Sequence, residues 1–240
     1  NKLLENLNDM QKAAVTYEGG PLLVLAGAGS GKTKVLTLRV AYFIENNLAK
    51  AENCLLLTFT NKAAKEMRER VNKLIPEAGL PAKTTPRGLW AGTFHSFCAK
   101  ILRIDGKHIG ISPGFLIYDD GDQKEAVKQI LDEMNFSTDA YNPAAILNVI
   151  SDAKNQMLTP TQYAEYVNSE WTEVVFKVYV AYEKLLKENA ALDFDDLLIK
   201  TVLLFGEVGQ ILSKWQEKLT HIFVDEWQDT NKIQYALIKF

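Results

Sequence analysis

The residues best suited to chemistry lie in the segment Pro21–Thr33, which reads PLLVLAGAGSGKT. Its glycines allow the backbone to turn tightly and to approach a ligand closely. Backbone N–H groups in such a loop, together with the N-terminus of a following helix, bind phosphate. Lys32 could reach the β- and γ-phosphates of a nucleotide, and the Thr33 hydroxyl could bind Mg²⁺. The segment therefore predicts a phosphate cradle, made of Ala26, Gly27, Ala28, Gly29, Ser30, Gly31, Lys32 and Thr33.

One residue departs from the usual form of this loop. The pattern G-x-x-x-x-G-K-S/T begins with glycine, and Ala26 stands in that first position here, whereas Gly31, Lys32 and Thr33 fit the pattern. A plain glycine-rich turn is the alternative interpretation. The apolar run before the loop and the helical spacing after it favour the cradle, because this motif connects a strand to a helix.

A second candidate group is the acidic pair Asp225-Glu226, which directly follows the apolar run His221–Val224. Open α/β sheets bind ligands at the carboxyl ends of their strands. Asp225 could hold Mg²⁺, usually through water, and Glu226 could orient and deprotonate an attacking water. Acids after a strand are a weak signal alone, since many strands end in solvated acids. Together with Gly31, Lys32 and Thr33, the pair predicts Mg²⁺-dependent nucleotide hydrolysis.

Strands and helices alternate through the first half of the sequence, as a phosphate-binding sheet requires. Apolar runs of strand length alternate with segments whose apolar residues recur at helical spacing. This alternation predicts an α/β fold with a parallel sheet and right-handed crossovers. The expected strands are Leu22–Leu25, Asn53–Thr60, Leu89–Phe94 and His221–Val224, and the expected helices are Asn8–Tyr17, Lys34–Ile44, Asn61–Ile75 and His95–Ile109, with a loop over Pro76–Pro86.

Residues 113–190 have a different, helical and acidic character. We assign no catalytic chemistry to this block, because solvated surface helices explain its charge. Helices are expected again over Asp193–Phe205 and Ile211–Leu219. Within the block the sequence predicts a short extended piece at Phe115–Tyr118, a helix that starts at a capping box of Asp122 and Glu125, a helix over Pro143–Met157 and a long amphipathic helix over Trp171–Leu186.

The composition is ordinary for a soluble globular protein, since 47% of the 240 residues are hydrophobic and 24% are charged. The net charge of −3 alone argues against nucleic-acid binding, but residues 1–105 carry +6, residues 106–192 carry −6 and residues 193–240 carry −3. The basic segment around the loop therefore permits a local anionic partner. No apolar run could span a bilayer and no signal peptide is recognised, so we expect a cytoplasmic protein. Cys54 and Cys98 lack metal-ligand spacing, so we expect both to be reduced core residues.

Several segments, taken in order, resemble the motifs of superfamily-1 DNA helicases of the PcrA/UvrD/Rep group. Trp227 stands where that family usually has tyrosine or phenylalanine, and we expect adjusted packing there. The resemblance covers essentially the whole chain. The matching segments are LNDMQKAAV (Q motif), AGAGSGKT (motif I), TFTNKAAKEMRERV (motif Ia), GTFHSFCAKILR (motif Ib), LDFDDLL (segment Id) and VDEWQDTN (motif II).

The resemblance implies a RecA-like subdomain 1A with an inserted all-helical subdomain 1B. Subdomain 1A would comprise residues 1–111 and 191–240, and subdomain 1B residues 112–190. The family also has a second RecA-like domain, whose arginines complete the ATP site, and we expect this chain to end before motif III. Loss of such arginines costs about 10³–10⁵ in rate, so the isolated fragment is expected to bind ATP weakly and to be largely inactive.

For the nucleotide, the resemblance implies ATP and Mg²⁺. Gln11 would contact the adenine through its side-chain amide. Without the surrounding motif, we would interpret Gln11 as an ordinary exposed glutamine. Gln228 would lie near the γ-phosphate and help to couple hydrolysis to DNA. Lys32, Thr33, Asp225 and Glu226 keep the roles argued above, with Thr33 and Asp225 on the metal.

For nucleic acid, the resemblance implies single-stranded DNA and junctions of single- and double-stranded DNA. Small polar side chains at strand ends bind phosphates, and aromatic side chains stack on bases without reading sequence. On sequence alone, Phe59 and Phe194 could instead be core residues and His95 a helix cap. The candidates are Phe59, Thr60 and Asn61 in motif Ia, Thr93 and His95 in motif Ib, and Phe194 in segment Id.

The leading hypothesis is thus the N-terminal motor fragment of an ATP-dependent 3′-to-5′ DNA helicase, acting near the nucleoid with accessory repair or replication proteins. A RecB/AddA-like helicase-nuclease shares these motifs and is one alternative. A nucleotide-binding scaffold without motor activity is another. A P-loop kinase is the weakest, since no motif for an acceptor substrate is visible.

Overall fold

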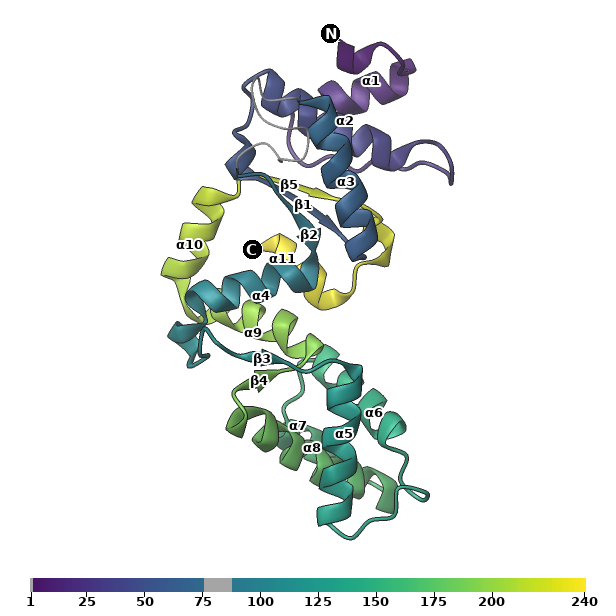
Figure 1. Cartoon of the computed structure of the whole chain (residues 1–240), viewed down its shortest axis with the longest axis vertical. Coiled ribbons are helices and arrows are strands. Elements are labelled where there is room, and N and C mark those ends of the chain that lie inside the picture. Colours follow the sequence, from purple (N-terminus) through teal and green to yellow (C-terminus); the bar gives the residue numbers. More distant parts are fainter. Residues whose placement is uncertain (1, 76–87) are drawn as a thin grey trace. The chain divides into compact units, whose positions relative to one another are not determined.

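The computed structural model describes residues 2–75 and 88–240 (Figure 1), so the predicted loop Pro76–Pro86 lies outside the described residues. The chain divides into two compact units. Unit 1 comprises Asn1–Ser96 and Ser213–Thr230, and unit 2 comprises Phe97–Leu212 and Asn231–Phe240. The predicted division into residues 1–111, 112–190 and 191–240 remains a prediction.

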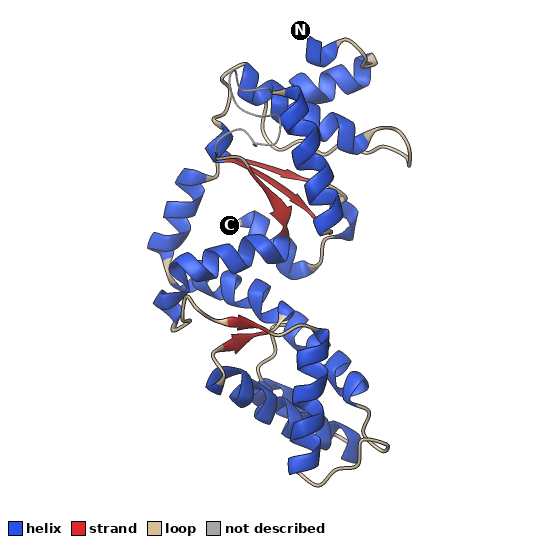
Figure 2. Ribbon diagram, viewed as in Figure 1, coloured by secondary structure: helices blue, strands red, loops and turns tan. Residues whose placement is uncertain are grey.

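Unit 1 contains a parallel sheet flanked by helices. Within its described residues, β1 (Cys54–Thr58) lies between β2 (Trp90–Thr93) and β5 (His221–Val224), and both pairs are parallel (Figure 2). Thr58 pairs with Thr93 and Leu57 with Val224, so the carboxyl ends of the strands meet at one edge. The predicted α/β fold with a parallel sheet is confirmed. The helices are η1 (Lys2–Leu4), α1 (Asp9–Thr16), α2 (Lys32–Glu45), η2 (Ala51–Asn53), α3 (Asn61–Leu74) and η5 (Trp227–Asp229).

Local sequence explains where these elements begin and what they bury. Asn8 caps α1 in a reciprocal capping box with Gln11, and the Thr60 hydroxyl caps α3 by accepting from the Ala63 N–H at 3.1 Å. Every residue of β1 is buried, as expected for a parallel strand covered on both faces. The buried face of α3 packs against β1, β2 and α2.

The predicted strand Leu22–Leu25 is wrong. Residues 21–27 form neither helix nor strand, and the side chains of this run are between 40% and 86% exposed. A strand requires backbone hydrogen bonds to a neighbouring strand, and none of the described strands pairs with this run. An apolar run of the right length is therefore not sufficient to form a strand here.

Unit 2 is mainly helical. Helices α5 (Asp120–Glu133), α6 (Pro143–Asn155) and α8 (Glu170–Glu188) pack together (Figure 1). They share one core, in which Val127, Ile146, Val178 and Tyr182 are fully buried. Two short strands, β3 (Leu116–Ile117) and β4 (Ala191–Leu192), pair in parallel. In the sequence, β3 comes just before these helices and β4 just after them. The helices are α4 (Phe94–Asp105), which begins in unit 1, η3 (Gly106–Ile109), α5 (Asp120–Glu133), α6 (Pro143–Asn155), α7 (Pro160–Tyr163), η4 (Ala164–Tyr166), α8 (Glu170–Glu188), α9 (Phe194–Glu207), α10 (Gly209–Lys218), which ends in unit 1, and α11 (Lys232–Lys239).

The predicted start of α5 is wrong by one helical turn. Asp119, not Asp122, is the N-cap, and its carboxylate accepts from the N–H groups of Gly121 and Asp122 at 2.8 and 3.0 Å. Asp122 instead completes the capping box from inside the helix. Both aspartates have an acid three positions later, so the spacing alone did not distinguish them. The predicted extended piece at Phe115–Tyr118 is confirmed as β3.

Both cysteines are buried and form no disulfide, as the sequence predicted. Burial raises the pKa of the Cys54 thiol to about 11 and that of the Cys98 thiol to about 12, because a thiolate is poorly solvated in the core. No helix in the described part of the chain is long and apolar enough to cross a membrane.

Candidate nucleotide site and nucleic-acid interface

The loop before α2 has the local geometry of an anion cradle. Gly29 and Gly31 have φ angles of 74° and 87°, in the left-handed region that favours glycine. Ala26 lies outside that region, so alanine is tolerated in the first position of the motif. Gly31 is the N-cap of α2 and provides no side-chain cap, which leaves N–H groups of the first turn available to an anion.

The structure brings the loop and the acidic strand end together. The Thr33 hydroxyl donates a hydrogen bond of 3.0 Å to Oδ2 of Asp225, a residue 192 positions later. Asp225 is 7% exposed, and its N–H donates to the Leu57 carbonyl at 2.9 Å, which continues the pairing of β5 with β1. Lys32 begins α2, and its Nζ lies 3.4 Å from the Ala26 carbonyl at the start of the loop.

The oxygens of Thr33 and Asp225 fit the chemistry of a Mg²⁺ site. Mg²⁺ in nucleotide enzymes is held by oxygen ligands, typically one or two carboxylates together with substrate phosphates. A hydroxyl and a carboxylate at hydrogen-bond distance, next to an anion cradle, provide such ligands.

Glu226 and Gln228 form a second polar pair beside Asp225. The Gln228 Nε2 donates to Glu226 Oε2 at 2.7 Å and to Asp229 Oδ2 at 3.2 Å. Glu226 adopts a left-handed conformation with a φ of 50° and a ψ of 46°. Such conformations are strained for residues other than glycine and cluster at functional sites. The strand end, the strained turn and the amide of Gln228 therefore fix where this carboxylate lies.

Gln11 contacts the loop directly and is more than an exposed surface residue. Its Nε2 donates to the Ser30 carbonyl at 3.1 Å, and its Oε1 accepts from the Asn8 N–H at 3.1 Å. The side-chain amide is thus already oriented by α1 on one side and by the loop on the other. Its predicted contact with adenine remains a prediction.

The DNA candidates of unit 1 lie at the same sheet edge, after the adjacent strands β1 and β2. Asn61 is exposed at the start of α3, and Thr60 is exposed while its hydroxyl caps that helix. Phe59 is half-buried, with its ring centroid 5.7 Å from that of Phe94. His95 is half-buried near the start of α4. The paired positions Thr58 and Thr93 explain why motifs far apart in sequence meet here.

Thr93 differs from the other candidates because it is 8% exposed and bonded to its neighbour Ser96. The Ser96 hydroxyl donates to the Thr93 carbonyl at 2.9 Å, and the Ser96 N–H donates to Thr93 Oγ1 at 3.2 Å. Ser96 is exposed as a residue, whereas Thr93 is buried. Sequence reasoning missed Ser96, although a threonine followed by a serine three positions later is a recognisable helix-start pattern.

Phe194 belongs to unit 2, where it is the first residue of α9 and is 40% exposed. The preceding Asp193 is the N-cap of α9 and forms a capping box with Asp196. The alternative that Phe194 is an ordinary core residue is not favoured by this exposure, because Leu197 and Leu198 of the same helix are 1% and 2% exposed.

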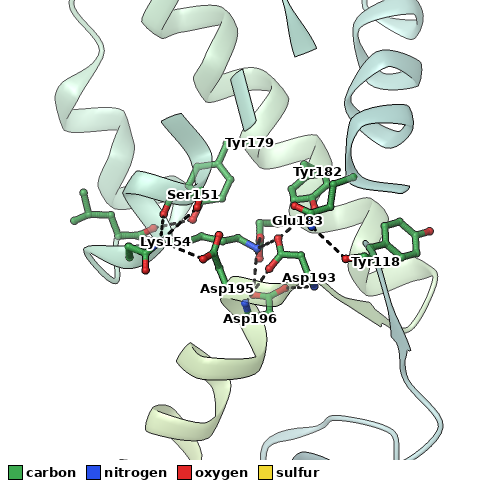
Figure 3. Close-up of polar contacts among 12 residues, drawn as sticks. Tyr118, Ser151, Lys154, Tyr179, Tyr182, Glu183, Asp193, Asp195 and Asp196 are labelled. Carbon is green, nitrogen blue, oxygen red and sulfur yellow. Dashed lines mark hydrogen bonds and ion pairs between the residues drawn. The ribbon is translucent and has the colours of Figure 1, made fainter. Parts of the chain in front are cut away.

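A buried ionic cluster around Lys154 was not found by sequence reasoning. Lys154 Nζ lies 2.7 Å from Asp193, 2.7 Å from Glu183 and 3.1 Å from Asp196, with its side chain only 3% exposed (Figure 3). Burial opposes the charge on Lys154, but the carboxylates outweigh it and raise its pKa well above the usual value. Burial raises the pKa of Asp196 to about 7, helped by Asp193 and Glu183 and opposed by Lys154.

Known proteins are similar to this chain along its whole length. Residues 7–240 match the family described as the UvrD/REP helicase N-terminal domain. The chain is 45% identical over 240 residues to an ATP-dependent DNA helicase PcrA of Bacillus subtilis (strain 168), all of the chain aligning with 31% of that protein. It is 44% identical over 239 residues to the PcrA helicase of Staphylococcus epidermidis and 43% identical to that of Staphylococcus aureus (strain Mu50), covering 32% of each. The chain thus spans about a third of the length of these curated relatives.

Proposed function

The chain belongs to the family of UvrD/REP helicase N-terminal domains, and on this premise we propose that it forms the first half of the motor of an ATP-dependent DNA helicase. The observation that carries the proposal is the 3.0 Å hydrogen bond from Thr33 to Asp225. It joins the phosphate loop to the acidic strand end, as hydrolysis of a Mg²⁺-bound nucleotide requires. The PcrA relatives are named as ATP-dependent DNA helicases, which favours ATP and DNA as substrates.

Each residue of this site would have a separate role in hydrolysis. The loop and the first turn of α2 bind the phosphates, and Lys32 turns from the Ala26 carbonyl toward the β- and γ-phosphates. Glu226 accepts a proton from the attacking water, and Gln228 holds that carboxylate in place. Thr33 and Asp225 would hold Mg²⁺, which neutralises charge that develops on the phosphates.

The sheet edge gives this site a physical connection to DNA. The Leu57 carbonyl of β1 accepts a hydrogen bond from the Asp225 N–H, and β1 ends at Thr58, directly before Phe59, Thr60 and Asn61. We propose that a shift at the nucleotide is transmitted through this strand to residues that would bind the DNA backbone and bases. We propose that ATP closes a cleft between this domain and a second RecA-like domain, and that hydrolysis reopens it during 3′-to-5′ stepping on single-stranded DNA. The expected nucleoid association and the accessory repair or replication partners belong to the same proposal.

The ATPase activity of the full-length protein, measured with and without single-stranded DNA, tests this function. A motor hydrolyses ATP slowly alone and much faster on DNA, and its DNA binding weakens steeply with added salt because phosphate contacts release counterions. Hydrolysis at the same rate with and without DNA would rule out the motor.

Replacing Gln11 with alanine is expected to weaken discrimination between ATP and GTP by about tenfold, since a bidentate amide contact to a base contributes ~1–3 kcal/mol. The competition of each nucleotide with a fluorescent ATP analogue measures this ratio. Gln210→Ala, at an exposed position of α10, is the matched control. If Gln11→Ala weakened the binding of ATP and GTP equally, the role of Gln11 would be to hold the loop through Ser30 and not to recognise adenine.

A further inference from the structure

We propose that Lys154 is a positioning residue that holds Phe194 in place for stacking on single-stranded DNA. This inference rests on the proposed function, because it takes Phe194 as a DNA contact. Lys154 lies in α6, 40 residues before Phe194, and belongs to none of the motifs that carry the resemblance.

The cluster around Lys154 joins three helices at the point where α9 begins. Lys154 comes from α6, Glu183 from α8, Asp196 from the first turn of α9, and Asp193 is the N-cap of that helix (Figure 3). The Tyr182 hydroxyl donates to Asp193 Oδ2 at 3.2 Å, the same oxygen that Lys154 contacts. The ammonium group thus links the helical block to the start of α9.

The anchored acids lie on both sides of Phe194 in the sequence. Asp193 and Asp196 are joined by the capping box, in which the Asp196 N–H donates to Asp193 Oδ1 at 2.8 Å. Asn155, next to Lys154, donates from Nδ2 to Asp195 Oδ1 at 3.1 Å. Two consecutive residues of α6 therefore contact the N-cap Asp193 and the α9 residues Asp195 and Asp196, and the backbone of Phe194 is fixed between them.

Stability alone explains this arrangement poorly. Buried ion clusters add little net stability, because desolvation offsets their attraction, and apolar replacements often do better. Asp193 alone would suffice to cap α9. The arrangement instead holds an apolar side chain that is 40% exposed at a defined position, although burying it would be more favourable. An exposed aromatic ring carried on a fixed backbone suits stacking on successive bases.

A double-mutant cycle in the full-length protein tests the inference, with the dissociation constant for a fluorescent single-stranded oligonucleotide as the measurement. Phe194→Ala is expected to weaken binding about tenfold, within the range for base–aromatic stacking. Lys154→Met is expected to weaken it about fivefold, and the double variant no more than Phe194→Ala alone. ATP affinity is expected to stay unchanged in all three. Lys177→Met, which removes an exposed ion pair with Glu173 in α8, is the matched control.

Asn155→Ala keeps the experiment decisive if Lys154→Met does not fold, because it loosens Asp195 without leaving a buried charge unpaired. It is expected to weaken DNA binding two- to threefold, again only when Phe194 is present. If the losses of DNA affinity multiply in the double variants, the positioning role is wrong. It is also wrong if Lys154→Met and Asn155→Ala bind DNA as tightly as the unmodified protein. In both cases Phe194 remains a DNA contact. No loss in Phe194→Ala would instead remove Phe194 from the DNA contacts of the proposed function, and the positioning role with it.

Discussion

Replacing Glu226 with glutamine is expected to slow ATP hydrolysis by the full-length protein by about 10²–10⁴, the usual contribution of a general base. Binding of ATP and DNA is expected to persist, because the substitution removes no residue of the phosphate loop. Glutamine keeps the shape of the side chain and can still accept the hydrogen bond that Gln228 donates to Glu226 Oε2 at 2.7 Å. Single-turnover hydrolysis on saturating single-stranded DNA, with separate titrations of ATP and DNA, measures both effects.

The matched control for this experiment is Glu217→Gln, which removes a carboxylate from an exposed position of α10 in the same unit. It is expected to hydrolyse ATP at the rate of the unmodified protein. If Glu226→Gln hydrolysed ATP at a rate close to that of the control, Glu226 would not be the base. If the unmodified protein also bound ATP without unwinding DNA, a scaffold whose nucleotide site only shapes partner binding would become the better interpretation.

Removing the Asp225 carboxylate is expected to reduce Mg²⁺-dependent ATP hydrolysis by about 10²–10³, since a bound cation contributes several kcal/mol to charge stabilisation. Asp225→Ala and Thr33→Val remove the two oxygens that lie 3.0 Å apart. Because both would hold the same ion, the double variant is expected to lose little more than Asp225→Ala alone. Hydrolysis rates measured across a Mg²⁺ titration check this, with the expected loss partly recovered at high Mg²⁺ for Thr33→Val.

Thr16→Val provides the control for the hydroxyl, because Thr16 donates to the Lys12 carbonyl within α1 at 3.0 Å and lies in the same unit. Its Mg²⁺ dependence is expected to match that of the unmodified protein. Independent, multiplying losses in Asp225→Ala and Thr33→Val would contradict a shared ion. The hydrogen bond between the two residues would then be a structural link between the loop and β5.

Most of the local geometry of the candidate nucleotide site could be predicted from sequence, because it is set by local rules. Gly29 and Gly31 are needed where the backbone is left-handed, and Asp225 follows β5, whose predicted bounds are confirmed at His221–Val224. The capping box of α1 was also predictable, since Asn8 and Gln11 are three positions apart. These features depend on neighbours in the sequence and not on distant packing.

Two other failures, Leu22–Leu25 and Lys154, arose where distant residues decide the outcome. The run Leu22–Leu25 has strand composition, but strand formation depends on a hydrogen-bonding neighbour that no local pattern reveals. Lys154 looks like one more surface lysine in an acidic block, and only the tertiary fold brings it to acids that lie 29, 39 and 42 positions away. Charge spacing within one helix could not have identified that cluster.

The conformation of Glu226 sets stability against activity at one position. A residue other than glycine in the left-handed region costs about 1–3 kcal/mol, and unit 1 carries this penalty at a φ of 50°. Glu226→Gly would relieve the strain and is expected to raise the melting temperature while it removes the proposed base. Variants of the full-length protein ranked by thermal tolerance would therefore be enriched in proteins that fold better and lack the proposed base. A screen that aims to preserve the motor should score hydrolysis alongside heat resistance from its first round.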